Sequence, residues 1–467
     1  MLILPNTPPL PLQFRSSRGQ SKLKANLLTL RASLQVPTLS NSNDTIRYAV
    51  ILSDYLESII RFASDSSNST QLSQVLQYAS EHEILSTGAD IPWSNTTFSE
   101  SHGRSVLGRN GGDKIKKVFL KAGGSGTPKA EYSWRLTNEI EMVIISLALI
   151  YIRIGSELSN EIIDNDEINP KEIPQYNEKW KQVVNFYKQA ISYLLLGTQH
   201  LSNVSNSNMN DMMFSFIMKL AEICIQMSIL SKSSWINRCN FNHTDTITTT
   251  NNGTLSRVAI YILNEIKSAQ TMLQGLKSIE GIRLNFTSWG EYLSVIESYS
   301  SAYAGLFLSI ENYQQDKLGN AIGLCHFSLV CLQGKKVSDK GTTKPFDKLR
   351  SKVNKRKNEH ILNHLNSVSS LNINKSVFND KSGIVLNDLV YLFDTLIRLN
   401  LKYEKENNNL KFDKVVNWMD INNDSKWPIG SKIPVSNVKP FVPQILQTAT
   451  GTDTTVQNEY AGRGAYY

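Results

Sequence analysis

The stretch "LTNEIEMVIISLALIYIRIGSEL", residues 136–158, decides how the whole chain folds. Several of its residues recur in alternating steps of four and three, which places them on one stripe of an α-helix: Ile140, Ile144, Leu147, Tyr151, Ile154 and Leu158. Other apolar residues fill most of the remaining helix surface: Val143, Ile145, Leu149, Ile150 and Ile152. A helix that is apolar on nearly all sides is buried on several of them, so this stretch predicts the central helix of the fold.

Most of the remaining sequence has the same helical spacing of apolar residues. We expect further helices at residues 176–201, 211–231, 256–280, 289–312, 315–333 and 384–405. Helices of similar length in succession are typical of helical hairpins stacked as a solenoid, as in TPR proteins. One short strand candidate, "KIKKVFLK" at residues 114–121, would add a small β-sheet near the N-terminal third. The predicted fold class is therefore all-α with a helical-hairpin core.

The composition predicts a soluble chain with one large domain. Of its 467 residues 40% are hydrophobic, and the longest apolar run, Met142–Ile152, is about half of what a bilayer span needs. The N-terminus "MLILPNTPPLPLQF" lacks the basic region of a signal peptide. We expect a short extension at residues 1–20, a helical domain at 21–435 and an extended tail at 436–467, because prolines recur and helical spacing ceases near residue 433.

The four cysteines form no C-x-x-C pair and predict buried, reduced thiols in a cytosolic protein.

The charge balance suggests an acidic partner. The chain has a net charge of +8 and a pI near 9. Ten Lys or Arg residues lie between residues 335 and 357, against two Asp. This run is compatible with a solvated loop and helix face, or with contact to anionic lipid. Nucleic acid is not expected, because no platform of aromatic stacking residues is interleaved with the run and no nucleic-acid motif surrounds it. The candidate membrane residues are Lys352, Lys355, Arg356 and Lys357.

No catalytic, cofactor or metal site is predicted. "GRSVLGRN" at residues 103–110 has the glycine spacing of a phosphate-binding loop but lacks its lysine and its Ser/Thr hydroxyl. His360 and His364 are four residues apart, yet the residues between them, "ILN", include no glutamate of the kind that a zinc protease would need. No G-x-S-x-G turn is present. These absences favour a binding module over an enzyme.

Several segments, in order, resemble the BRO-type domain of the Alix and Bro-one superfamily. "YEKENNNLKFDKVV", residues 403–416, is similar to the signature that ends the last long helix of that family. The central helix at 136–158, "FYKQAISYLL" at 186–195 and "WGEYLSVIESYSSAYAGLFLS" at 289–309 resemble its earlier helices. "IPWSNTTFSE" at 91–100 and the closing "GRGAYY" resemble the PalC-like group of fungal pH-response regulators within it.

The resemblance implies a curved, banana-shaped body and an adaptor role without enzymatic activity. BRO-type domains bind the C-terminal amphipathic helix of an ESCRT-III subunit, a helix-in-groove mode of recognition. By this resemblance the partner-binding residues on the central helices are Ile144, Leu147, Tyr151 and Leu194. Trp427 and Lys432 in "WPIGSK" (residues 427–432) match a short segment that assists binding in PalC-like proteins, with lysine near the family's arginine position.

The same resemblance implies a role in ambient alkaline pH signalling, at endosomes or puncta of the cell cortex, alongside a signalling protease complex. Two other functions stay open from the sequence. One is a general helical-repeat scaffold or endosomal sorting factor for acidic partners, and the other is a binder of anionic membrane.

In the signature at residues 403–416 we expect polar residues to end the helix. We expect Phe412 and Val416 to pin the returning chain to the body.

Overall fold

The computed structural model covers the chain of 467 residues. It describes residues 2–14, 22–37, 39–87, 91–99, 132–165, 168–201, 211–244, 247, 249–279, 281–332, 381–421 and 427–445. The strand candidate at 114–121 and the basic residues 352 and 355–357 lie outside these ranges.

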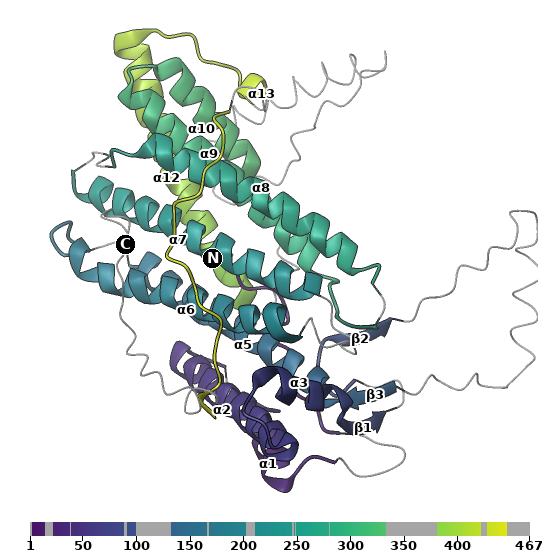
Figure 1. Ribbon diagram of the computed structural model, residues 1–467. Helices are drawn as coiled ribbons and strands as arrows, with labels where there is room; N and C mark the ends of the chain where they lie inside the picture. Colours follow the sequence, from purple (N-terminus) through teal and green to yellow (C-terminus); the bar gives the residue numbers. More distant parts are fainter. Residues whose placement is uncertain are drawn as a thin grey trace, which may run out of the picture.

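The protein is an elongated, curved helical body, which confirms the predicted all-α class (Figure 1). From α5 onward, each long helix packs chiefly against its neighbour in sequence, as stacked hairpins do. The helices of this body are α5 (Leu136–Ile163), α6 (Asn177–Leu196), α7 (Asp211–Thr244), α8 (Asn252–Leu276), α9 (Trp289–Gln314), α10 (Leu318–Leu332) and α12 (Ile384–Glu406).

A smaller N-terminal part contributes helices and two short sheets at one end of the body. Its helices are α1 (Ala25–Ser33), α2 (Ser42–Ser67) and α3 (Leu72–Glu81). Antiparallel sheets join β1 (Glu83–Thr87) to β3 (Tyr132–Arg135), and β2 (Thr96–Ser99) to β4 (Gly281–Leu284). The short helical segments are η1 (Ile173–Tyr176), η2 (Gly197–Leu201), η4 (Lys381–Gly383), η5 (Asn407–Lys411) and α13 (Trp418–Ile421). The predicted β component near the N-terminal third is therefore confirmed.

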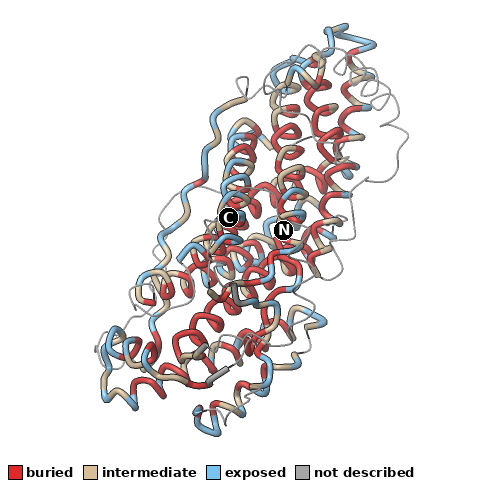
Figure 2. The backbone as a smooth tube through the Cα atoms, turned by 90° about the vertical axis from the view of Figure 1, so that its right-hand side faces the viewer, coloured by how far each residue is buried: buried red, intermediate tan, exposed pale blue. Residues whose placement is uncertain are grey.

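Helix α5 is central, as its sequence predicts. Nearly all of its residues are buried, and it packs against α2, α6 and α7. Figure 2 shows buried residues along the length of the helical body. Helices α5 and α7 are long and apolar enough to cross a membrane, yet both are mostly buried inside the body, as core helices are. Helix α7 is longer than the helix expected at residues 211–231, because it continues to Thr244. Burial of Cys239 and neighbouring residues favours this continuation.

Residues 2–12, predicted as an extension, pack into the body. Leu2, Ile3 and Leu4 are buried. The hydroxyl of Ser156 on α5 donates to the Leu2 carbonyl at 3.0 Å, and the indole of Trp289 on α9 donates to the Pro5 carbonyl at 3.0 Å. These bonds satisfy backbone groups that burial would otherwise leave unpaired. The segment therefore bridges α5 and α9.

The N-terminal part is fixed to α5 by one buried carboxylate, that of Glu139. Its side chain is 0% exposed, and that of its ion-pair partner Arg31 is 1% exposed. The Arg31 Nε lies 2.6 Å from Glu139 Oε1, which also accepts from the Tyr55 hydroxyl at 3.0 Å. The indoles of Trp93 and Trp134 both donate to Glu139 Oε2 at 2.9 Å. One carboxylate thus receives donors from α1, α2, β3 and the segment before β2.

Arg31 extends the hydrogen-bond network of Glu139 to other parts of the chain. Its guanidinium donates to the Leu12 carbonyl and, at 2.7 Å, to the Pro92 carbonyl. It also lies over the Phe14 ring, 4.0 Å from the centroid. The buried charges are therefore paired and hydrogen-bonded, the condition under which an ion pair survives in a protein interior.

The end of the last long helix differs from expectation. Helix α12 runs into a π-helical turn at Asn407–Lys411, and Phe412 then adopts the left-handed conformation with φ 57°. The Phe412 side chain is 76% exposed, so the prediction that it pins the chain to the body is wrong. Val416 is half-buried, and its N–H donates to the Gly319 carbonyl at 3.1 Å. This backbone hydrogen bond, rather than the Phe412 side chain, holds the chain after α12 against α10.

Asn407 and two glycines hold the chain in place of Phe412. The buried Asn407 amide donates to the Asp413 carbonyl at 3.0 Å and accepts from its N–H at 2.8 Å. A Cβ at Gly319 would lie 2.3 Å from the Lys414 carbonyl oxygen, and one at Gly323 would lie 2.4 Å from that of Val416. The glycines on α10 therefore allow the returning backbone to approach closely.

Replacing Glu139 by glutamine should destabilise the protein strongly. The variant keeps the shape of the side chain but leaves the Arg31 charge buried without its counter-charge, which costs about 3–5 kcal/mol. Chemical denaturation of Glu139→Gln measures this loss as a lower midpoint.

The exposed Glu172 offers a matched control. Glu172→Gln should change the free energy of unfolding by no more than about 0.5 kcal/mol. Equal midpoints for Glu139→Gln and Glu172→Gln would contradict the role given to the buried carboxylate.

Candidate partner-binding surface

An aromatic stack lies on the outer side of α5 and α6. The Tyr151 ring of α5 lies 6.3 Å from the Phe186 ring and 5.7 Å from the Tyr193 ring, centroid to centroid, and both pairs are stacked. Tyr151 and Phe186 are half-buried, whereas Tyr193 is buried. Phe186 and Tyr193 are seven residues apart on α6, which places them on the same side two turns apart. We call these three rings the aromatic stack.

The hydroxyl groups of the stack stay neutral. Burial raises the pKa of Tyr151 well above its ordinary value, and Tyr193 beside it raises the pKa further. Burial also raises the pKa of Tyr193, whose hydroxyl lies 3.0 Å from that of Ser53 on α2. The surface therefore offers aromatic faces and neutral hydroxyls.

A C-terminal segment, residues 427–445, runs in extended form across the helices and ends at this surface (Figure 1, yellow). Its Phe441 ring stacks on Tyr193 with the centroids 4.4 Å apart. The Phe441 N–H donates to the Ser192 carbonyl at 2.9 Å, and the Ser192 hydroxyl donates to the Lys439 carbonyl at 2.8 Å. The surface thus holds an extended peptide by one aromatic ring and by its backbone.

Further polar contacts fix the C-terminal segment along its path. The buried Gln226 amide on α7 donates to the Ile433 carbonyl at 3.0 Å and accepts from its N–H at 2.9 Å. The Ser431 N–H donates to the Arg257 carbonyl on α8 at 3.1 Å. At the far end, the Gln444 N–H lies 3.1 Å from both carboxylate oxygens of Glu57 on α2. The segment therefore connects α8, α7, α6 and α2.

The predicted partner-binding residues fall in different surroundings. Ile144, Leu147 and Leu194 are fully buried and belong to the core, because α2, α6 and α7 cover α5 on several sides. In this conformation they offer no surface to a partner. Tyr151 is the predicted residue of the central helices that reaches the surface, as part of the aromatic stack.

Trp427 and Lys432 both belong to the C-terminal segment, away from Tyr151. The half-buried Trp427 packs edge-on against Phe327 of α10, and its indole donates to the Ile421 carbonyl at 2.7 Å. Lys432 is exposed beside the clamped Ile433. The sequence analysis therefore predicted one member of the aromatic stack, Tyr151, and missed Phe186 and Tyr193, as well as Phe441, which stacks on Tyr193. The seven-residue spacing of Phe186 and Tyr193 is the signal that could have found two of them.

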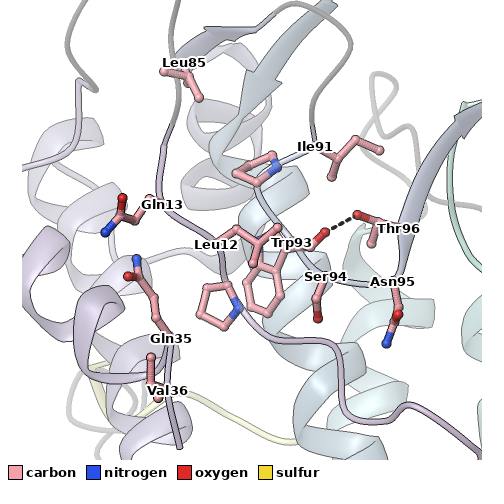
Figure 3. A pocket seen from close by; sticks show the side chains of 12 residues that line it. Leu12, Gln13, Gln35, Val36, Leu85, Ile91, Trp93, Ser94, Asn95 and Thr96 are labelled. Atoms are coloured by element: carbon pink, nitrogen blue, oxygen red, sulfur yellow. Dashed lines mark hydrogen bonds between the residues drawn. The ribbon is translucent and has the colours of Figure 1, made fainter.

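A separate hollow lies between the N-terminal residues and the segment before β2 (Figure 3). It has a volume of about 630 Å³ and is lined by apolar and amide side chains, including Leu12, Gln35 and Val36. Thr96 donates to the Trp93 carbonyl at 2.6 Å and holds one wall in place. Within the described residues, no group of three His, Cys, Asp or Glu side chains is arranged to hold a metal ion.

Comparisons with known proteins give one family and several solved structures. A model of the family described as "Family of unknown function (DUF5355)" matches residues 134–467, from β3 to the end of the sequence. A comparison with curated proteins finds no match.

Three of the similar structures have ALIX or Bro1 in their titles. "ALIX BRO1 CHMP4C complex" is 14% identical, with a TM-score of 0.44, and the match covers 95% of this chain and 97% of that chain. "Crystal Structure of ALIX in complex with the SIVmac239 PYKEVTEDL Late Domain" is 13% identical, with a TM-score of 0.44 and coverages of 96% and 50%. "Structure basis for endosomal targeting by the Bro1 domain" is 11% identical, with a TM-score of 0.37 and coverages of 80% and 88%.

The four cysteines should be unreactive in the native protein. They are free and buried, which confirms the prediction of buried thiols, and burial raises the pKa of Cys224, Cys325 and Cys331 to about 12. Because the thiolate is the reactive form, Ellman's reagent at pH 8 should label almost no thiol until denaturant is added, and then all four. Rapid labelling without denaturant would contradict this burial.

Removing the Gln226 clamp should loosen the C-terminal segment locally. Gln226→Leu eliminates two buried hydrogen bonds to Ile433, each worth about 1 kcal/mol. Hydrogen exchange of peptides around residue 433 should accelerate by about tenfold or more. Gln182→Leu, a change at an exposed position of α6, serves as the control. Unchanged exchange in Gln226→Leu would show that other contacts hold the segment.

Proposed function

The chain belongs to the family described as "Family of unknown function (DUF5355)", and from this premise we propose that it is a non-enzymatic adaptor of the BRO type. In this proposal its helical domain, residues 21–435, binds the C-terminal amphipathic helix of an ESCRT-III subunit. The ordered resemblance of its helices and of residues 403–416 to BRO-type domains supports the assignment.

One observation carries the binding proposal: the aromatic stack has an occupied end and an accessible end. At the occupied end Phe441 covers Tyr193, with ring centroids 4.4 Å apart. At the other end Tyr151 and Phe186 are half-buried. Exposed aromatic surface on rigid helices favours contact with the apolar face of a partner helix. The partner would therefore lie on α5 and α6 beside the C-terminal segment.

Charge would act on the approach of the partner more than on its final contacts. The net charge of +8 attracts an acidic helix over a distance. Next to the stack the charges are mixed: Asp54 and Glu57 on α2 raise the pKa of Tyr193, while the Lys188 ammonium donates to the Ser436 hydroxyl at 2.9 Å. Apolar contact would therefore set the affinity, and long-range charge the rate of association.

The finer role we propose is that of a PalC-like component of fungal alkaline pH signalling. The adaptor would be recruited from the cytoplasm to endosomes or cortical puncta, and would bring ESCRT-III to the signalling protease complex without cleaving anything itself. "IPWSNTTFSE" at residues 91–100 and the closing "GRGAYY" support this role by resemblance. The segment with Trp427 and Lys432 would assist binding, as the resemblance of "WPIGSK" implies.

A second candidate function is a general helical scaffold or endosomal sorting factor for acidic partners. The stacked helices from α5 to α12 and the basic net charge support it. It differs from the first in specificity, because a scaffold that recognises charge would bind acidic helices regardless of where their apolar residues stand.

Binding of a labelled ESCRT-III C-terminal helix, followed by fluorescence anisotropy, tests the proposal. Tyr151→Ala with Phe186→Ala should weaken binding by about 30-fold or more, because central aromatic residues of an interface are worth about 2 kcal/mol or more. A second peptide with the same composition but shuffled apolar positions should bind much more weakly.

Val390→Ala provides the matched control, since Val390 is an exposed apolar residue on α12 rather than on α5 or α6. Its affinity should equal that of the unmodified protein, and thermal melting should confirm that all variants are folded. Absence of binding by the unmodified protein, or equal affinity of the double variant, would reject the proposed surface. Equal binding of the shuffled peptide would favour the general scaffold.

A further inference from the structure

The C-terminal segment, residues 427–445, is held in two different ways along its length. Up to Ile433 it is anchored by buried groups. Ile433 is 8% exposed, and its backbone is paired with the buried Gln226 amide by hydrogen bonds of 3.0 and 2.9 Å. The rest of the segment, residues 436–445, continues over α6 to α2 (Figure 1). We call residues 436–445 the strap.

The strap is held by hydrogen bonds that water can reach. The Ser192 hydroxyl on α6 donates to the Lys439 carbonyl at 2.8 Å, and the Lys188 ammonium donates to the Ser436 hydroxyl at 2.9 Å. Lys439 and Ser436 are both exposed. Water replaces such bonds at little cost, whereas breaking the buried Gln226 bonds would leave polar groups unpaired. The strap can therefore open while the anchored part of the segment stays in place.

The Phe441 ring is the contact between the strap and the aromatic stack. It lies 4.4 Å from the Tyr193 ring, centroid to centroid. Tyr193 is the buried ring of the stack, whereas Tyr151 and Phe186 are half-buried. Phe441 thus occupies a place on the stack that accepts an aromatic side chain, and we call this place the Tyr193 subsite.

A partner helix on the stack would meet the closed strap. The Phe441 ring lies 4.4 Å from Tyr193, and Tyr193 lies 5.7 Å from Tyr151. An α-helix with its side chains is about 10–12 Å across, so these two separations together do not exceed the width of one helix. A helix seated on Tyr151 therefore touches Phe441 or takes its place. Displacement exposes the face of Tyr193 to the partner and breaks bonds that water replaces.

We propose that the Tyr193 subsite takes an aromatic or large apolar side chain of the partner helix, and that Phe441 fills it until the partner arrives. This inference rests on the proposed binding of a helix to the aromatic stack. The closed strap leaves Tyr151 and Phe186 to the partner, and the open strap adds Tyr193. Because full contact requires the open strap, the apparent affinity falls with the fraction of molecules that are open. The strap therefore favours partners that carry a side chain for the Tyr193 subsite.

Two variants that weaken the strap should tighten binding of the labelled ESCRT-III helix. Phe441→Ala removes the competing ring and should raise the affinity by about fivefold or more. Ser192→Ala removes one strap bond without changing any ring, so it should act in the same direction with a smaller gain. Val442→Ala is the matched control, because this neighbouring side chain is 45% exposed, and it should leave the affinity unchanged. An unchanged or lower affinity of Phe441→Ala would overturn the proposal.

Hydrogen exchange measures the release of the strap directly. When the helix binds the unmodified protein, peptides that contain the Phe441 and Gln444 amides should exchange about tenfold faster or more, because both amides lose their partners on α6 and α2. Peptides around Ile433 should keep their rate. Slower exchange of the strap on binding would also overturn the proposal, since the strap would then be part of the bound surface. Lack of peptide binding in every variant would reject the proposed function, whereas binding with a closed strap would overturn this inference alone.

Discussion

The buried Glu139 carboxylate is the interaction on which the arrangement of the N-terminal part depends. It stands on the central helix α5 and receives hydrogen bonds from Arg31, Tyr55, Trp93 and Trp134. Burying a charged group away from water costs more free energy than one or two hydrogen bonds recover. The buried carboxylate is therefore stable only when its whole network of hydrogen bonds is formed. Each donor comes from a different part of the chain, and together they fix α1, α2, β3 and the segment before β2 on α5.

This attachment also shapes the candidate partner-binding surface. Helix α2 covers one side of α5 and brings Ser53 and Glu57 next to Tyr193 and Gln444. Helix α6 covers another side, so the inner stripe of α5 is sealed and Tyr151 remains at the surface. The C-terminal segment closes part of the same surface with Phe441. Partner binding, as proposed, would thus depend on packing contributed by both ends of the chain.

The sequence predicts the helices well because apolar spacing is a local property. It predicts α5 as the central helix, since residues 136–158 are apolar on nearly all sides. The same feature explains why Ile144, Leu147 and Leu194 could not be placed correctly on a surface. The sequence of a helix that is apolar on all sides does not show which side faces water. The helices packed around it determine which residue stays exposed.

Features that depend on contacts distant in sequence could not be predicted. The Glu139 network joins residues up to 108 positions apart, and Gln226 clamps Ile433 across 207 positions. At the end of α12, Phe412 and Val416 were expected to anchor the chain, but Asn407 holds the backbone and Phe412 faces water. Asparagine can form paired bonds to a peptide group that an apolar side chain cannot form. The composition of "KENNN" gave no sign of which asparagine would be buried.

The most direct test of the adaptor account is to find where an ESCRT-III helix touches the protein. A photo-crosslinking amino acid placed at Phe186 on α6 and, separately, at Val36 after α1 would report contact with the bound peptide at each of these two places. The account predicts a strong cross-link from position 186 and none from position 36. A cross-link at position 36 alone, or at neither position while the peptide is bound, would contradict it.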